Sequence, residues 1–443
     1  MAVSHTPIPF VQWLTTFSAV LDKRSAVRLA TLWVGVVLAR GRRTVTRWIR
    51  AAGLSDQFRY CYDTVAAAGK RADLLAARLA HAAVTPLVAG QKRWLFALDD
   101  TPTRRYGPCV QGAGLHHNPT PGPAGGPFVY GHVWVVLALL AKHSVWGTIA
   151  LPLLARLYVR RKNLPSIPTR HRPAFRTKLE LAIELLTWAK TWLHHGGQSL
   201  WVVADGAYAK APFLKPAMKL GFTVVRRLRK DAALFDVPSP PRKGRRGRRR
   251  KYGARRLGLV QRATHRHGWQ TGTFPLYGKA TTKTYKTFLA TWPPVGGGIR
   301  VVVVKESHGG IAFFATDPAA TVADVLEAVA DRFSLEIAFR DLKEIVGAGQ
   351  QQTRFHFANV GAFHLCVWTF TLTEAWAWRR DEAALVDRRS SPWDVEPRRP
   401  SHADKRNALR RELLREELAA VLVPSMTADK LHAAADRLLQ LAA

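Results

Sequence analysis

The chain has 443 residues, with 67 Lys or Arg against 31 Asp or Glu, which gives a formal net charge of +36. A hydrophobic content of 47% with 15 Trp excludes a disordered chain, and the length allows several domains. So large a positive charge predicts an anionic partner, and nucleic acid fits best because each neutralised phosphate releases counterions. We expect no membrane partner, because the sequence has no basic amphipathic helix and no lipidation signal.

The cysteines indicate a reducing compartment. Cys61, Cys109 and Cys366 are far apart in the sequence and form no CxxC pair. The first residues, "MAVSHTPIPFVQWL", lack the basic start and apolar run of a secretory signal. Together these features predict a cytoplasmic protein.

Residues 1–90 are expected to be helical, since they are rich in Ala, Leu and Arg and poor in Gly. Within them, "RRTVTRWIRAAGLSDQFRYCYD" (42–63) fits either a helix-turn-helix, with Gly53 in the turn and Ser55 as N-cap, or an ordinary helical hairpin. The hairpin is slightly favoured, because such patterns are common.

Residues 94–98 follow as an apolar strand that is expected to end at Asp99 and Asp100. The apolar segments 128–141 and 145–158 predict two more buried strands. Each is shorter than the ~18 residues that a membrane-spanning helix needs.

The same pattern then repeats. An amphipathic helix is predicted over 174–196, and a buried strand over 200–204 ends at Asp205. A helix at about 208–219 and a strand at 222–228 complete an alternation of helices and strands, which is typical of an α/β sheet. Functional sites of such sheets commonly lie at the carboxyl ends of the strands, where these carboxylates are expected.

A Pro-, Gly- and Arg-rich stretch over 236–256 predicts a basic loop, and residues 257–316 are predicted to be mainly β. The loop is read equally well as a nonspecific phosphate clamp or as a disordered solubilising segment. Its candidate phosphate-binding residues are Arg242, Lys243, Arg245, Arg246, Arg248, Arg249, Arg250 and Lys251.

A late helix over 321–346 places four charged residues on one stripe: Arg332, Glu336, Arg340 and Lys343. Apolar residues flank the stripe on both sides, namely Leu335, Phe339, Leu342, Val346, Phe333 and Ile337. An intrahelical ladder of salt bridges is the plain explanation, but it does not account for these flanks. The remaining chain predicts a helix over 357–380, a Pro-containing break over 386–402 and a charged helical tail over 403–440.

Three acids therefore become candidate metal ligands: Asp99 (or Asp100), Asp205 and Glu336. Three carboxylates in one place repel one another unless a divalent cation lies among them. On a strongly basic protein this predicts Mg²⁺ acting on phosphodiesters, with two ions that activate the attacking oxygen and stabilise the leaving one. No Gly-rich phosphate loop with the required Lys is present, so no nucleotide cofactor is expected.

The order and setting of these acids resemble bacterial insertion-sequence transposases of the DDE class. That family has a ribonuclease-H-like core, and its first strand often carries Asp-x-Thr, which Asp99-Asp100-Thr101 matches. The second acid of the family ends the fourth strand, as Asp205 does. On this basis Asp99 is preferred over Asp100 as the first ligand.

One branch of the family carries Tyr-x2-Arg-x3-Glu-x6-Lys, and the chain matches it at Arg332, Glu336 and Lys343 but has Val329 at the Tyr position. The resemblance implies that Glu336 completes the metal site, while Arg332 and Lys343, with Arg340 beside them, hold DNA phosphates.

The expected fold is α/β, with a mixed ribonuclease-H-like sheet, a β-rich insertion and helical ends. The predicted parts are a helical DNA-binding or assembly region (1–90), the first part of the core (91–235), the basic loop and β-rich insertion (236–319), the second part of the core with the Glu helix (320–385) and a charged tail (386–443).

The resemblance implies a transposase that cuts element ends and joins the freed 3′-hydroxyl to target DNA. It implies two Mg²⁺ ions, for which Mn²⁺ can substitute, double-stranded DNA as partner, a homodimer on DNA and a place near the bacterial nucleoid. The alternatives are a ribonuclease-H-like nuclease without strand transfer and a DNA-binding derivative without catalysis. A glycosidase with paired carboxylates explains neither the net charge nor the Arg-rich loop.

Overall fold

A computed structural model describes residues 9–118, 125–239, 250–307, 309–389, 391–421 and 427–442. Its centre is a mixed sheet in which β1 (Arg93–Arg104) lies between β3 (Phe128–His143), which is antiparallel to it, and β5 (Ser199–Ala204), which is parallel. Next to β5 lies the parallel strand β6 (Phe222–Arg227), and β4 (Gly147–Tyr158) pairs with β3. The order β4-β3-β1-β5-β6, with these directions, is that of a ribonuclease-H-like core, as the sequence predicted.

The strand that carries Asp99 is longer than expected. Its pairing with β5 ends at Leu98, opposite Ala204, but its pairing with β3 continues to Arg104, opposite Gly131. The prediction that β1 ends at the two acids is therefore wrong for the strand as a whole and right for its parallel edge. The reason is that β3 goes on supplying hydrogen-bond partners after β5 has turned away.

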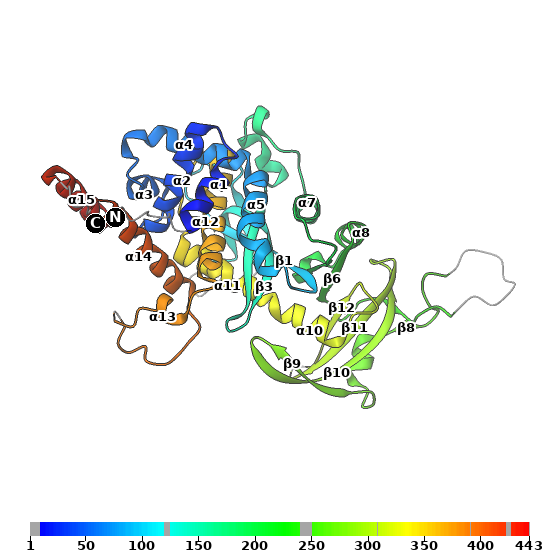
Figure 1. Ribbon diagram of the computed structural model, residues 1–443. Coiled ribbons are helices and arrows are strands. Elements are labelled where there is room, and N and C mark those ends of the chain that lie inside the picture. Colours follow the sequence, from blue (N-terminus) through cyan, green and yellow to red (C-terminus); the bar gives the residue numbers. More distant parts are fainter. Residues whose placement is uncertain are drawn as a thin grey trace.

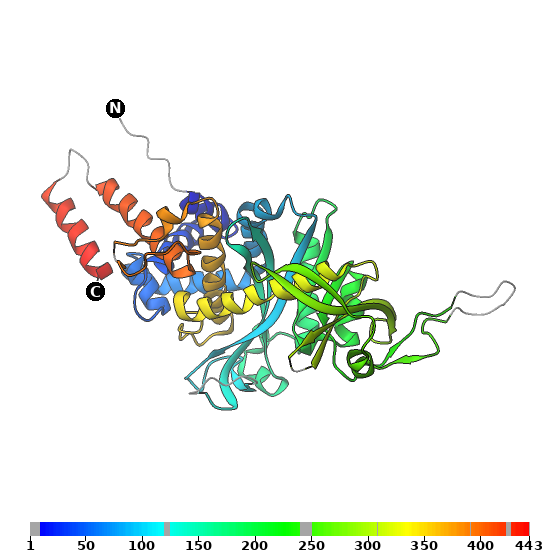
Figure 2. The ribbon, with the colours of Figure 1, turned by 90° about the horizontal axis from the view of Figure 1, so that it is seen from below.

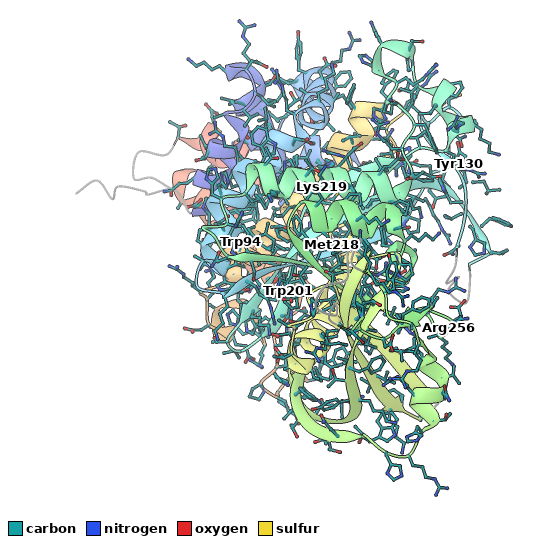
Figure 3. The ribbon with its side chains drawn as sticks, turned by 90° about the vertical axis from the view of Figure 1, so that its right-hand side faces the viewer. Trp94, Tyr130, Trp201, Met218, Lys219 and Arg256 are labelled. Atoms are coloured by element: carbon teal, nitrogen blue, oxygen red, sulfur yellow. The ribbon has the colours of Figure 1, made fainter. Side chains whose placement is uncertain are left out.

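Helices cover both faces of this sheet. α7 (Lys178–Trp192) begins at a capping box of Thr177 and Glu180 and packs beside α8 (Ala211–Lys219). Figure 3 shows α8, labelled at Met218 and Lys219, lying over the sheet. On the other side α12 (His356–Ala377), buried along almost its whole length, packs against β4 and stacks Phe363 on Trp134 of β3, with ring centroids 4.1 Å apart.

The N-terminal helices surround α12 (Figure 1). They are α1 (Pro9–Ser18), α2 (Lys23–Leu38), α3 (Val45–Ala51), α4 (Phe58–Lys70), α5 (Ala72–Leu79) and α6 (Thr85–Val88). Contact between α4 and α12 is very close, because a Cβ added at Gly361 would lie 1.9 Å from the carbonyl oxygen of Val65. The indole of Trp33 on α2 also donates to Thr369 of α12 at 2.8 Å. The helical region is thus packed onto the core.

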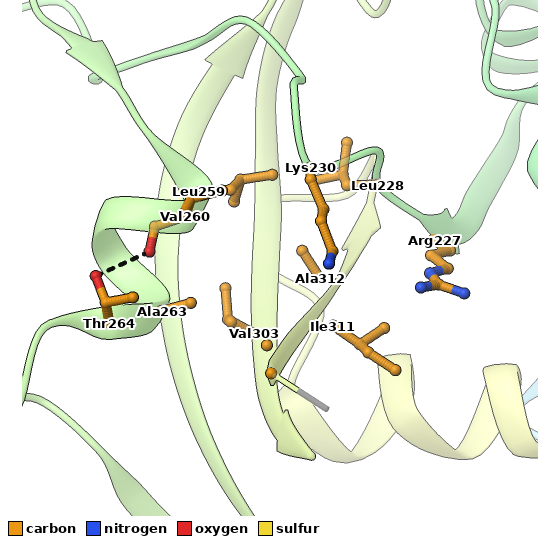
Figure 4. Close-up of a pocket in the computed structure, with 12 residues that line it drawn as sticks. Arg227, Leu228, Lys230, Leu259, Val260, Ala263, Thr264, Val303, Ile311 and Ala312 are labelled. Atoms are coloured by element: carbon orange, nitrogen blue, oxygen red, sulfur yellow. Dashed lines mark hydrogen bonds between the residues drawn. The ribbon is translucent and has the colours of Figure 1, made fainter. Parts of the chain in front are cut away.

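The predicted β-rich segment adds strands to the core sheet. The short strand β7 (Leu234–Phe235) precedes this segment, and the elements that follow are β8 (Arg256–Leu257), α9 (Leu259–Thr264), β9 (Gln270–Leu276), β10 (Lys279–Trp292), β11 (Gly297–Glu306) and β12 (Gly309–Ala315). β12 pairs antiparallel with β6, so the 12-stranded sheet is continuous, and Figure 2 shows the added strands at one end of the molecule. A pocket of about 160 Å³ lies between α9 and the first residues of β12, with Arg227 and Lys230 among its lining residues (Figure 4).

The predicted helix over 321–346 is divided. It consists of α10 (Val322–Asp331), α11 (Phe333–Asp341) and a π-helical turn (Leu342–Val346) that ends at Gly347 with φ of 86°. Arg332 lies at the junction of the two helices. Figure 2 shows this yellow segment running from the insertion into the core.

The remaining elements are short or peripheral: β2 (Gly114–His117), which pairs with β3, α13 (Glu382–Leu385), α14 (His402–Val421) and α15 (Ala428–Ala442). α14 packs against α12, so the charged tail begins as part of the core. Within the described residues, no helix is both long and apolar enough to cross a membrane.

Candidate catalytic site

Asp99 lies where the parallel edge of β1 ends, and its side chain is 18% exposed. One carboxylate oxygen accepts from the backbone N–H of Asp100 at 2.8 Å, and the other accepts from Arg332 at 2.8 Å. Burial raises the pKa of Asp99 to about 6; the guanidinium of Arg332 works against this, and the charges of Asp205 and Asp100 add to it. Asp99 is therefore an acid held close to other acids.

Asp100 makes a different contact. Its carboxylate binds the ammonium group of Lys178 at 2.6 Å, at the first residue of α7. Successive residues of a strand point to opposite faces, which explains why two adjacent acids have separate partners. Of the two, Asp99 is the one that shares a partner, Arg332, with Glu336.

Asp205 directly follows β5 and begins a short 3₁₀ turn, Gly206–Tyr208. Its carboxylate is exposed, and the hydrogen bond that it accepts among the described residues is a long one, 3.5 Å, from the N–H of Ala207. Because β5 is the parallel neighbour of β1, Asp205 lies next to Asp99 in the fold, and its charge acts on the pKa of Asp99. Capping of the turn is therefore weak and leaves the carboxylate oxygens of Asp205 accessible to another ligand.

Glu336 lies on α11, one turn after Arg332, and its side chain is 43% exposed. The two terminal nitrogens of Arg332 bind two different acids, Asp99 through Nη1 and Glu336 through Nη2. The guanidinium thus joins β1 to α11. The local ion pair with Glu336, which the salt-bridge explanation of the stripe predicts, is present. Arg332 also binds Asp99, which that explanation does not predict.

The donor set fits a hard divalent cation, since Asp99, Asp205 and Glu336 offer only carboxylate oxygens. As the side chains stand, however, no three His, Cys, Asp or Glu residues within the described ranges are close enough together to hold a metal ion. The fold brings the three acids to one region, with Arg332 rather than a ready cluster between two of them.

The charged stripe keeps its regular helical spacing as far as Arg340 but not to its last residue, Lys343. Arg340 is exposed and pairs with the adjacent Asp341 at 2.9 Å. The π-helical turn begins right after Asp341, so the 3.6-residue period is lost before Lys343. Lys343 is half-buried, and its partial removal from water lowers its pKa.

The apolar residues that flank the stripe differ in burial between its two sides. Leu335, Phe339, Leu342 and Val346 are buried, whereas Phe333 is 48% exposed and contacts the ring of Tyr277. One edge of the stripe is therefore packed, whereas on the other edge Phe333 is exposed and Ile337 is half-buried.

The sequence reading missed two residues near the acids. Arg226 of β6 is fully buried, and none of its three guanidinium nitrogens has a hydrogen-bond partner among the described residues. Its burial lowers its pKa to about 9, which the charges of Asp205 and Tyr208 oppose. The hydroxyl of Tyr208 is likewise buried without a partner, and burial raises its pKa. The available signal was an Arg in a strand buried on both faces.

Most of the basic loop lies outside the described residues, including Arg242, Lys243, Arg245, Arg246, Arg248 and Arg249. Arg250 and Lys251 are described and are exposed. Whether the loop contacts phosphate therefore stays a prediction.

The model of one protein family, described as DDE superfamily endonuclease, matches residues 16–287. The match includes Asp99 and Asp205, whereas Glu336 lies beyond its end. No curated protein matches the chain. Endonucleases of this superfamily act on DNA and generally use divalent metal ions. The match spans more than half of the chain, so the protein belongs to the DDE superfamily of endonucleases.

Proposed function

We propose that the protein is a DDE transposase that cuts DNA at the ends of an insertion element and joins the freed 3′-hydroxyl to target DNA. The observation that supports the proposal is that three acids from separate elements lie in one region: Asp99 and Glu336 share Arg332, and the charge of Asp205 acts on Asp99. The family match supports the nuclease part of the proposal.

Asp99, Asp205 and Glu336 would hold two Mg²⁺ ions, or Mn²⁺ in their place, with Asp100 as the alternative to Asp99. Such ions activate the attacking oxygen and stabilise the leaving oxygen of a phosphodiester. In the cutting step a water oxygen bonds to phosphorus and the bond to the 3′-oxygen breaks, which leaves a 3′-hydroxyl and a 5′-phosphate. In the joining step that hydroxyl attacks a target phosphodiester and displaces its 3′-oxygen.

The chain's own cations would position the DNA. Arg332, Arg340 and Lys343 lie on or next to the helix of Glu336, and Arg250 and Lys251 are exposed at the insertion. Contacts of this kind fix the register of a duplex without reading its sequence. A homodimer on paired ends, with residues 1–90 in DNA binding or assembly, completes the proposal.

The test uses labelled duplexes made from the DNA that flanks the coding sequence, a supercoiled target plasmid and Mg²⁺. We expect nicked ends and labelled plasmid joints from the wild-type protein, and neither product from Asp205→Asn, which should still bind the duplex. Asp231→Asn is the matched control, because Asp231 is exposed and pairs only with Arg229 in the ion pairs described. Nicking without joints would favour a nuclease without strand transfer. Absence of both products from the wild-type protein would favour a DNA-binding derivative.

A further inference from the structure

Arg332 occupies the oxygens that a bridging metal ion needs. Its two terminal nitrogens contact Asp99 Oδ2 and Glu336 Oε1, one from a strand and one from a helix. A divalent cation shared by these two acids requires the same carboxylates. The guanidinium of Arg332 and the divalent cation would lie only a few ångströms apart. Their repulsion therefore disfavours simultaneous binding of both to these carboxylates.

The two halves of the contact differ in exposure, since the side chain of Asp99 is only 18% exposed whereas the Glu336 half is more open to water. The side chain of Arg332 is 20% exposed and that of Glu336 is 43% exposed, so water reaches the pair. Ion pairs that are open to water contribute little net stability, which makes exchange of one cation for another feasible.

The buried guanidinium of Arg226 limits where the guanidinium of Arg332 can move once it is displaced. Arg226 lies fully buried on β6, and its charge and that of Arg332 repel each other. Movement of Arg332 into the protein is therefore opposed, and the open direction is toward solvent, where a DNA phosphate can accept its hydrogen bonds.

We propose that Arg332 is an exchangeable counter-ion, which binds Asp99 and Glu336 until a divalent cation displaces it and then binds a DNA phosphate. The inference rests on the proposed function, because it requires Asp99 and Glu336 to be metal ligands. It makes metal binding and DNA binding mutually reinforcing through one residue, and such coupling is reciprocal by thermodynamic necessity.

The first experiment measures Mn²⁺ binding to the full-length protein without DNA, from the free Mn²⁺ signal in electron paramagnetic resonance. Arg332→Ala removes the competing cation, so its Mn²⁺ affinity should rise by about tenfold. Arg332→Lys should lie between the two, since lysine keeps the charge but lacks the two-pronged geometry. Arg229→Ala is the control, because Arg229 is an exposed arginine that pairs with Asp231, and it should bind Mn²⁺ like the wild type. Unchanged or weaker binding by Arg332→Ala overturns the inference.

The second experiment measures DNA affinity with and without Ca²⁺ at constant ionic strength. Ca²⁺ should strengthen DNA binding by the wild-type protein and by Arg229→Ala, and the enhancement should be smaller in Arg332→Ala. An enhancement of the same size in Arg332→Ala overturns the inference, even if that variant binds DNA more weakly overall.

Two further variants separate this inference from the proposed function. If neither Asp99→Asn nor Glu336→Gln weakens Mn²⁺ binding, the metal site is absent and both proposals fail. If both variants weaken Mn²⁺ binding while Arg332→Ala leaves it unchanged, only the exchange fails.

Discussion

Asp99 and Arg332 are 233 positions apart in the sequence, yet a carboxylate oxygen of the first accepts a hydrogen bond from the second at 2.8 Å. This contact joins the central strand β1 to the junction of α10 and α11, and Glu336 is one turn further along. It brings the first and last of the three candidate acids within reach of one guanidinium.

The two adjacent acids of β1 should differ in importance. Asp99→Asn is expected to lower Mg²⁺-dependent cleavage by at least about a hundredfold, since even outer-shell partners of metal sites contribute 10- to 100-fold. Asp100→Asn removes the bond to Lys178 instead and should cost much less. Cleavage rates at saturating Mg²⁺ decide between them. A larger loss in Asp100→Asn would assign the first ligand to Asp100.

Cleavage should depend on pH through Asp99. Its pKa in the folded protein is about 6, raised mainly by burial, so its ionised form is lost as the pH falls below that value. The folded chain also binds this proton more tightly than the unfolded chain, so between about pH 4 and 6 the free energy of unfolding should fall as pH rises. Urea titrations across this window check the effect, and Asp99→Asn should remove it. A slope that persists in Asp99→Asn would assign it to another group.

The buried cluster of Glu374, His402 and Lys405, which joins α12 to α14, should contribute to stability. Glu374 accepts from His402 at 2.7 Å and from Lys405 at 2.6 Å, and all three side chains are nearly inaccessible. Glu374→Gln leaves a buried lysine without its counter-charge and should lower the free energy of unfolding by about 3–5 kcal/mol. Glu412→Gln, which affects a more exposed pair with Arg380, should cost about 1 kcal/mol or less.

The same group predicts acid sensitivity. Although burial opposes it, the charge of Lys405 and the bond from His402 hold the pKa of Glu374 at about 2. Its contribution is therefore fully present above the ordinary carboxyl pKa and is lost as the pH falls toward 2. Urea unfolding at neutral pH and near pH 3 measures both effects. Equal stability of wild type and Glu374→Gln would contradict them.

The contact between α4 and α12 should not tolerate a methyl group. In Gly361→Ala the new Cβ would lie 1.9 Å from the carbonyl oxygen of Val65, so the helices must separate. This should cost about 1–3 kcal/mol or more, despite the better helix propensity of alanine. Gly90→Ala, where no atom lies within 4 Å of the new Cβ, is the control. Similar melting temperatures for both variants would show that the helices can move apart freely.

Arg226 is expected to lower the stability of the fold and to support cleavage. Its charge is buried and its nitrogens lack hydrogen-bond partners in the described part of the chain, so Arg226→Met should raise the free energy of unfolding by about 1–4 kcal/mol. The same change removes a positive charge near Asp205 and Asp99, and cleavage should fall. Unfolding and cleavage measured on one preparation test both. A large loss of stability would show that Arg226 has partners within the fold.

Much of the fold follows from local patterns. The apolar runs predicted β3, β4, β5 and β6 within a few residues, and the Pro-, Gly- and Arg-rich stretch indicated where the core is interrupted. By contrast, the helix after residue 321 was predicted as one element, and the interruption at Arg332 was missed because helical residues continue across it. The carboxylate pattern indicated the candidate acids, but not the contact that Arg332 makes with Asp99.

The sequence by itself determined the anionic partner, the α/β core and the three acids worth testing, because charge, hydrophobic periodicity and strand ends are properties of neighbouring residues. Only the tertiary structure decided that β12 joins the insertion to the core sheet, that Arg226 is buried near the acids, and that Arg332 lies between Asp99 and Glu336. These relationships depend on the packing of elements far apart in the chain, and no local pattern specifies which side chains such packing brings together.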